Sequence, residues 1–198
     1  MSRQTDPFVP LLEEALEASL AAKRATLASE GGRLVALARE MAEVFRGGGR
    51  VFFFGNGGSA ADAQHLAAEF VNRFRMERRP LPGIALTTDT SILTAVGNDY
   101  SFDDVFAKQV QALGRPGDMA VGISTSGHSP NVVKALAAAR EAGLRTVALT
   151  GRGGGRMAET ADLVLRAASD DTPRIQEVQI FLGHLLCDLV ERILFAAP

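Results

Sequence analysis

Four side-chain hydroxyls lie within six residues in the segment 124–129, which reads Ser-Thr-Ser-Gly-His-Ser. They belong to Ser124, Thr125, Ser126 and Ser129. The segment follows a short apolar run and precedes a helical pattern, so the N–H groups and the positive dipole end of a helix would add to the hydroxyls. A helix cap needs one such hydroxyl, and four together favour a phosphate cradle. It is not a Walker loop, because no Gly-Lys-Ser/Thr follows.

A second turn, Gly-Asn-Gly-Gly-Ser at 55–59, also follows an apolar run. Its glycines would let the backbone come close to a ligand, although a tight turn alone explains them as well. Ala60 and Ala61 break the full G-x-G-x-x-G pattern, which disfavours a dinucleotide site. A further polar pair, Asn98 and Asp99, stands in what looks like a turn after a helix and could contact sugar hydroxyls.

His65 and Glu69 are four residues apart in a helical pattern, which places both side chains on one helix face. Asp62 precedes them on the same side. A histidine and a carboxylate at this spacing can share a divalent metal ion. They can equally form a hydrogen bond at the surface, and the sequence around an isolated pair favours that simpler alternative.

The last helical pattern carries Gln176 and, eight residues later, His184. Eight residues rise about 12 Å along a helix. One metal ion could hardly be held by both side chains of a single helix, so a site that used both would lie between subunits. A packed core histidine is the alternative for His184, and His128 is expected to be a loop residue.

The elements that must position these residues form an alternating series. Continuous apolar runs separated by helical patterns are typical of a parallel sheet covered on both faces. Right-handed crossovers then give a doubly wound sandwich that binds ligands at the carboxyl ends of its strands. The sequence thus predicts an α/β fold, a three-layer αβα sandwich. Its five parallel strands are expected at 51–54, 84–86, 119–123, 146–149 and 163–165.

Helices rather than strands are expected before residue 49. Apolar residues at helical spacing predict one helix over 7–29 and another over 32–45, ended by three glycines at 47–49. These helices would pack on the core or against other subunits. Further helices are expected over 60–74, from 91 and over 132–142. The last would run from Thr172, as N-cap, to about Phe195. No linker divides the chain, so a single domain over 1–198 is expected.

Composition narrows the function classes. The 198 residues are 46% hydrophobic and 22% charged, with a formal net charge of −2, so direct binding of nucleic acid is not expected. No apolar run reaches the roughly 20 residues of a membrane span, and residues 1–10 lack a signal-peptide pattern. The one cysteine, Cys187, is expected to be a small buried hydrophobe, and the chain fits a reducing cytoplasm.

Several separated motifs occur in register along nearly the whole chain. They are 55–59, Asp62 to His65, Gly97 to Asp99, 122–129, Thr150-Gly151 and Arg174 to Glu177. In this combination the chain resembles the sugar isomerase (SIS) domain family and, within it, the phosphoheptose isomerases. The resemblance implies a flavodoxin-like αβα subunit, a homotetramer and active sites between subunits.

The resemblance also implies roles for individual residues. Glu69 and His184 match the acid/base pair of an aldose–ketose isomerase that works through an enediolate. The substrate would be sedoheptulose 7-phosphate and the product D-glycero-D-manno-heptose 7-phosphate, in the first step of nucleotide-heptose (ADP-heptose) synthesis for lipopolysaccharide or another glycan. One Zn²⁺ per subunit would be held by His65, Glu69, Gln176 and His184. The resemblance also implies phosphate contacts from Ser124, Thr125, Ser126 and Ser129. Sugar contacts would come from Asn56, Gly57, Gly58, Asn98 and Asp99. Glu69 and Gln176 would contact the substrate as well.

Two positions depart from the family pattern, and one relative offers a rival function. Pro173 replaces an acidic residue, and Gln179 stands where many members carry a histidine. The rival is a non-catalytic SIS-domain tetramer that binds the bacterial replication initiator and shares the arginine-rich stretch after 72, the run 107–110 and the Cys-Asp-Leu ending at 187–189. That relative lacks matches to the acid/base pair. Glu69 and His184 are both present here, which favours the enzyme.

Overall fold

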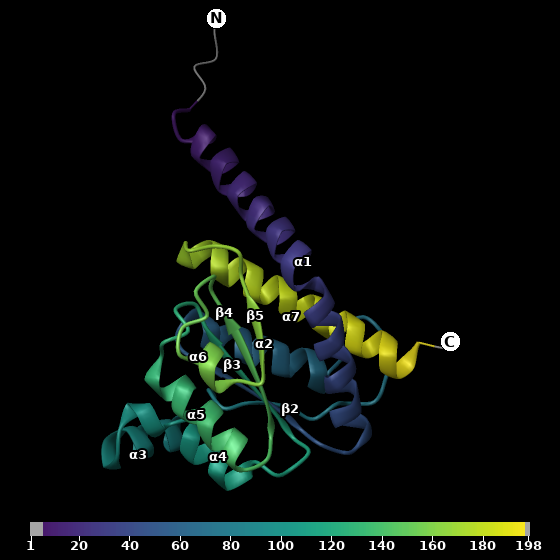
Figure 1. Ribbon diagram of the computed structural model, residues 1–198, viewed down its shortest axis with the longest axis vertical. Coiled ribbons are helices and arrows are strands. Elements are labelled where there is room, and N and C mark those ends of the chain that lie inside the picture. The colour runs from purple at the N-terminus through teal and green to yellow at the C-terminus, as the bar shows by residue number, and fades with distance from the viewer. Residues whose placement is uncertain (1–5, 197–198) are drawn as a thin grey trace, which may run out of the picture.

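The computed structural model describes residues 6–196 and contains one sheet of five parallel strands in the order β2-β1-β3-β4-β5. All five predicted strands are present, within one or two residues of the expected bounds. Figure 1 shows the sheet between layers of helices, with β4 and β5 toward the viewer. The strands are β1 (Val51–Gly55), β2 (Gly83–Ala85), β3 (Met119–Ser124), β4 (Arg145–Thr150) and β5 (Leu163–Arg166).

Alternate side chains of each strand feed two separate apolar clusters, one on each face of the sheet. Phe53 and Val121 join the cluster under α1 (Val9–Arg46), α2 (Gly58–Val71) and α7 (Thr172–Phe195). Phe52 and Phe54 join the other cluster, which includes residues of α4 (Ala107–Leu113), α5 (Pro130–Glu141) and α6 (Met157–Thr160). Both faces are therefore covered, which confirms the predicted αβα sandwich.

The prediction of two N-terminal helices was wrong. A single helix of 38 residues, α1, runs from Val9 to Arg46 and passes through Gly31 and Gly32 without a break. A glycine inside a helix costs only about 1 kcal/mol, and packing against α7 outweighs two such losses. Glu30 and Leu34, on either side of the glycines, are both buried.

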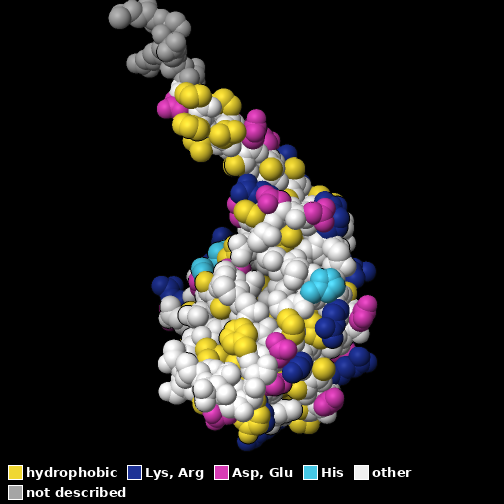
Figure 2. Space-filling view, turned by 90° about the vertical axis from the view of Figure 1, so that its left-hand side faces the viewer, with side chains coloured by type: hydrophobic (Ala, Val, Ile, Leu, Met, Phe, Trp, Pro, Cys, Tyr) yellow, Lys and Arg dark blue, Asp and Glu magenta, His cyan; other side chains and the backbone are white. Residues whose placement is uncertain are grey.

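The N-terminal half of α1 extends beyond the sandwich (Figure 1). Hydrophobic side chains gather on this half of the helix in Figure 2. Phe8 and Leu12 are each 69% exposed, and Leu11 and Leu16 are more than half exposed. The helix therefore presents an apolar surface that residues 6–196 of this one chain do not cover.

Three local details differ from the predictions. The short helices α4 and α6 were not predicted, since seven and four residues are too few to show a helical period. Asn98 and Asp99 form the end of α3 (Thr90–Asp99) rather than a turn after it. The N-cap of α7 is Asp171, so Thr172 lies within the helix.

Among residues 6–196, no helix is long and apolar enough to cross a membrane.

Candidate functional site

The two motif-bearing turns lie side by side because their strands are neighbours. Strand β1 leads into 55–59 and β3 leads into 124–129, and Gly55 pairs with Ile123 in the sheet. Both turns thus emerge at the carboxyl edge, where doubly wound sheets bind ligands. Between them is a cavity of about 120 Å³. Its lining is polar apart from one side chain and consists of Asn56, Ser59, Ile123, Ser124, Thr125, Ser126, Ser129 and Gln176.

The hydroxyls of the serine turn converge in this cavity. Ser124 Oγ lies 2.9 Å from Ser129 Oγ and 3.4 Å from Ser126 Oγ. Ser129 immediately precedes α5, and its side chain makes no capping hydrogen bond to that helix. A hydroxyl that does not cap its own helix can donate to a ligand. The group therefore has the donors and the helix N-terminus that a phosphate dianion requires.

Gln176 reaches the same cavity from α7 because Gly58 has no side chain. A Cβ on Gly58 would lie 2.4 Å from Gln176 Nε2. Gly57 serves a different purpose, since its φ of 55° is a conformation that side chains disfavour. The glycines of this turn therefore admit Gln176 to the cavity and allow the tight bend into α2.

Two residues of this region were not among the predicted site residues. Ser59 is buried and lines the cavity. Asn131 exchanges two side-chain hydrogen bonds with Asn56, at 2.9 Å and 2.8 Å, which fixes the two turns against each other. Ser59 is the last residue of the motif at 55–59, so that motif could have identified it as a site residue. Asn131 depends on a contact 75 residues away, which no local pattern reveals.

His65, Glu69 and His184 meet where α2 crosses α7. His65 Nε2 is 3.0 Å from Glu69 Oε1 and 3.2 Å from His184 Nε2. Gly183 permits this approach, because a Cβ there would lie 2.5 Å from Leu66 Cδ2 of α2. The predicted acid/base residues are thus brought together, and His184 is half-buried at the surface rather than a core histidine.

Burial and neighbouring charges affect two titrating groups of this cluster. Desolvation lowers the pKa of His184, His65 lowers it further, and Glu69 raises it. Burial raises the pKa of Asp62, against a smaller opposing effect of His65. Asp62 Oδ2 is buried and has no hydrogen-bond partner among residues 6–196. Burial therefore disfavours the charged forms of both groups, the imidazolium of His184 and the carboxylate of Asp62.

The donor types of this cluster suit zinc, but the arrangement within one chain does not complete a site. Two imidazoles and a carboxylate are common zinc ligands. However, the three side chains bond to one another, and among the described residues no group of three or more His, Cys, Asp or Glu is placed to hold a metal ion. The fourth predicted ligand, Gln176, lies in the serine cavity instead.

Other predicted site residues lie apart from the serine cavity. His184 lines a separate cavity of about 220 Å³ with Phe74, Arg75 and three further residues of α7. Asn98 and Asp99 are exposed at the end of α3, where Asn98 Nδ2 donates to Asp99 Oδ1 at 2.8 Å. A single chain therefore displays the predicted site in separate pieces, as the helix-rise argument for Gln176 and His184 anticipates.

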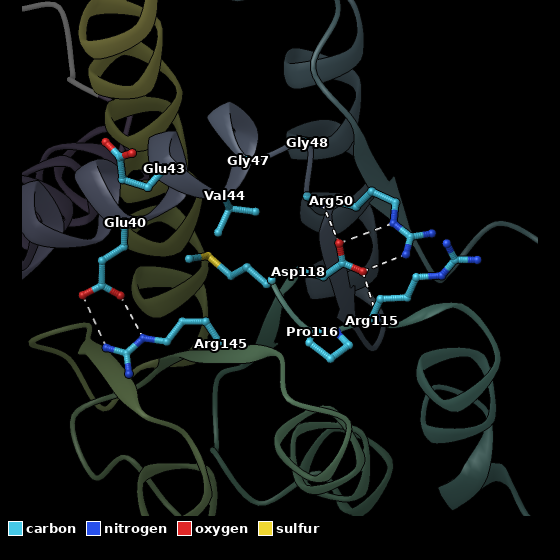
Figure 3. Close-up of a pocket in the computed structure, with 13 residues that line it drawn as sticks. Glu40, Glu43, Val44, Gly47, Gly48, Arg50, Arg115, Pro116, Asp118 and Arg145 are labelled. Atoms are coloured by element: carbon cyan, nitrogen blue, oxygen red, sulfur yellow. Dashed lines mark hydrogen bonds and ion pairs between the residues drawn. The ribbon is translucent and has the colours of Figure 1, made fainter.

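A larger cavity, of about 610 Å³, opens at the opposite edge of the sheet (Figure 3). Its charged side chains are mostly paired with each other. Arg50 binds Asp118 at 2.8 Å, and Arg145 binds Glu40 at 2.8 Å. Because these charges are neutralised internally, and because none of the predicted site residues lines it, we assign the chemistry to the carboxyl edge.

The family model that describes the SIS domain matches residues 16–151 of the chain. A phosphoheptose isomerase of Roseiflexus sp. (strain RS-1) is 54% identical over 195 residues, which are 98% of this chain and 99% of the relative. A phosphoheptose isomerase of Nitratidesulfovibrio vulgaris (strain Miyazaki F) is 65% identical over 163 residues, 82% of this chain and 78% of the relative.

A solved structure agrees with the sequence comparisons. Phosphoheptose isomerase GmhA from Neisseria gonorrhoeae superposes with a TM-score of 0.87 at 45% identity and covers 92% of this chain and 97% of its own.

Proposed function

The chain belongs to the SIS domain family and, within it, to the phosphoheptose isomerases, and from this membership we propose that it converts sedoheptulose 7-phosphate to D-glycero-D-manno-heptose 7-phosphate. The observation that carries the proposal is that the chain presents both a hydroxyl-lined cavity and a His–Glu–His cluster. The first suits the phosphate, and the second supplies proton transfer. The product would enter nucleotide-heptose synthesis in the cytoplasm.

The phosphate would sit in the serine cavity at the N-terminus of α5. The hydroxyls of Ser124, Ser126 and Ser129 now bond to one another. On binding, they would donate to the phosphate oxygens instead. Binding the phosphate end holds the remote reacting carbons in place, so binding energy is used to position them. Asn56 and Gln176 line the same cavity and would contact the adjoining sugar atoms.

Each member of the acid/base pair would move one proton in each half of the reaction. Glu69 takes a proton from C1 of the ketose, the C1–H electron pair forms the C1=C2 bond, and the carbonyl electrons pass to O2, which His184 protonates. In the second half His184 takes the O1 proton, the O1–H electron pair forms the C1=O1 carbonyl, and the C1=C2 pair takes the proton that Glu69 returns to C2.

We further propose one Zn²⁺ per subunit, bound by His65, Glu69 and His184, with Gln176 supplied by a second copy. When bound, it would either polarise the carbonyl or mainly order the site, since a carboxylate that binds the ion cannot act as the base at the same moment. Two observations support an assembly of this kind. Gln176 and His184 are about 12 Å apart along α7, and the apolar surface on α1 suits burial in a homotetramer.

Turnover of sedoheptulose 7-phosphate by the purified chain tests the function. We expect Glu69→Gln and His184→Gln each to lower kcat by about a hundredfold or more, as for loss of a general acid or base. His128→Gln is the matched control, since His128 is exposed in the serine turn and has no role in proton transfer. Full turnover in both site variants would contradict the assigned mechanism.

The rival function predicts a different outcome. A protein that only binds the replication initiator would turn over no sugar phosphate even with zinc supplied. The curated relatives described above are all named isomerases, which favours the enzyme.

A further inference from the structure

Behind the acid/base cluster, Arg78 and Glu191 form an ion pair that is almost completely buried. Arg78 Nε lies 2.9 Å from Glu191 Oε1, and each side chain is only 1% exposed. Glu191 stands on α7 two turns after His184, and Arg78 lies in the loop that follows α2. A buried pair of this kind carries a desolvation cost and is weak evidence for stability alone. The other contacts of Arg78 and Glu191 therefore have to account for the buried pair.

The Glu191 side chain holds the backbone of the loop after α2. Its carboxylate accepts the N–H groups of Phe74 at 2.7 Å, Arg75 at 2.8 Å and Met76 at 2.9 Å. Burial by itself would raise the pKa of Glu191, but these three donors and Arg78 lower it below its usual value. The carboxylate is therefore charged, and it fixes three consecutive residues of the loop.

Arg78 organises the end of α2. Its Nη2 donates to the carbonyl of Glu69 at 2.9 Å, and its Nη1 donates to the carbonyls of Phe70 at 2.8 Å and Asn72 at 3.3 Å. The last carbonyls of a helix lack partners within it and need donors from outside. The arginine thus holds the turn of α2 from which the Glu69 side chain projects.

The loop fixed by Glu191 also touches the other member of the acid/base pair. The ring centroid of Phe74 lies 5.5 Å from that of His184, with the two planes inclined by 31°. Phe74 is the residue whose N–H makes the shortest of the three bonds to Glu191. A change in the loop would therefore move the ring that packs on the imidazole.

We propose that Arg78 and Glu191 are positioning residues of the isomerase site, which together set the geometry of Glu69 relative to His184. Arg78 acts on Glu69 through its backbone carbonyl, and Glu191 acts on His184 through Phe74. Neither residue touches substrate. The proposal rests on the acid/base roles given above, and it goes beyond them by naming the residues that hold Glu69 and His184 in place relative to each other.

The chain contains a matched pair that has no connection with the site. At the opposite edge of the sheet, Arg50 binds Asp118, whose side chain is 4% exposed. Asp118 also accepts backbone N–H groups, from Arg50 at 2.8 Å and from Arg115 at 3.0 Å (Figure 3). The two pairs share their chemistry, so the same substitution in each separates loss of stability from loss of positioning.

The test compares Arg78→Lys with Arg50→Lys in the full chain. Lysine keeps the charge but cannot bond Glu191 and the helix carbonyls in the same planar arrangement. We expect Arg78→Lys to lower kcat by about tenfold to a hundredfold with KM changed by less than about twofold, since misplacement by about 1 Å has such effects. Arg50→Lys should leave both constants within about twofold of the parent and lower the unfolding midpoint, by less than Arg78→Lys because the Arg50 side chain is 27% exposed.

Histidine NMR supplies a readout that does not depend on turnover. The chain has three histidines, and His128 lies outside the cluster. With ¹³Cε1-labelled histidine, Arg78→Lys should shift the signals of His65 and His184 and leave that of His128 in place. Arg50→Lys should shift none of them. Phe74→Leu, which keeps the ion pair, should shift His184 alone if the ring transmits the effect.

Two results would overturn the proposal. One is unchanged His65 and His184 signals in Arg78→Lys. The other is an equal fall in kcat for the two arginine variants, which would mean that stability alone is at stake. An inactive parent enzyme would instead count against the proposed function, and the histidine signals would still decide whether the pair positions the cluster.

Discussion

At the scale of single residues, the site depends on small groups as much as on reactive ones. Gly58 admits Gln176 to the serine cavity, and Gly183 admits Leu66 and so lets α2 approach α7. The hydroxyls of Ser124 and Ser129 are already oriented toward each other at 2.9 Å. A site built in this way loses little entropy when a phosphate binds, because its donors are positioned in advance.

Asp162 provides a residue-scale prediction of pH dependence. Burial would raise the pKa of this carboxyl, but hydrogen bonds from Thr146 N–H and Oγ1, at 2.9 Å and 2.8 Å, and the charges of Arg145 and Arg140 lower it. A lowered pKa in the folded state gives stability that is present above the unfolded value and lost as the pH falls through the folded value.

Asp162→Asn should therefore reduce the free energy of unfolding by about 1–2 kcal/mol at pH 7. The difference from the parent should shrink as the pH falls below about 4, because the carboxyl of the unfolded parent takes up its proton there and that of the folded parent does so only at lower pH. Urea unfolding titrations between pH 3 and 7 measure this difference in the free energy of unfolding. Asp170→Asn, whose side chain is 77% exposed in a surface pair with Arg152, is the control and should change little. A difference that does not vary with pH would contradict the assigned cause.

At the scale of elements, the crossing of α2 and α7 decides whether the proposed acid/base pair can form. His65 and Glu69 come from one helix and His184 from the other, 119 residues beyond His65. The loop after α2 adds Phe74 to the cluster. The interhelix distance at Gly183 would therefore control the geometry of the proposed acid/base pair.

Gly183→Ala tests this control. A Cβ 2.5 Å from Leu66 Cδ2 must push the side chain aside or separate the helices. We expect kcat to fall by about tenfold or more, because His184 moves relative to Glu69, and the His184 NMR signal to shift. Gly153→Ala is the control, since nothing lies within 4 Å of a Cβ placed there. Parent-like turnover in Gly183→Ala would show that Leu66 absorbs the extra methyl group.

At the scale of the whole molecule, the separate cavities of one chain raise the question of how a complete site forms. Gln176 lines the serine cavity and His184 lines another, although both belong to α7. The exposed side chains of Phe8, Leu11, Leu12 and Leu16 give α1 an apolar surface of the kind found at subunit contacts. Both features support the proposed homotetramer with sites between subunits.

Hybrid tetramers test the sharing of sites. If one site takes Gln176 from one copy and His184 from another, then Gln176→Ala and His184→Gln chains, each inactive alone, should regain activity when unfolded together and refolded as a mixture. Some sites would then receive both intact residues. Size measurement by light scattering checks that the mixture is tetrameric. A tetrameric mixture without activity would place both residues of each site in one chain.

Sequence alone determined much of the fold and of the site. The continuous apolar runs predicted all five strands, because a strand buried on both faces has to be apolar throughout. The turns at 55–59 and 124–129 were placed correctly at the carboxyl edge, since both follow such runs directly. The burial of Cys187 among the residues of α7 is also confirmed.

Tertiary structure decided what local patterns do not encode. The helix α1 is continuous because packing against α7 outweighs the low helix propensity of Gly31 and Gly32. The bond between Asn56 and Asn131, the Arg78–Glu191 pair and the meeting of His65 with His184 all join residues more than 70 positions apart. Residue type and spacing identify groups able to bind phosphate and move protons. Only the packing of α2 on α7 brings His65, Glu69 and His184 within bonding distance, and only the pairing of β1 with β3 sets the two turns side by side.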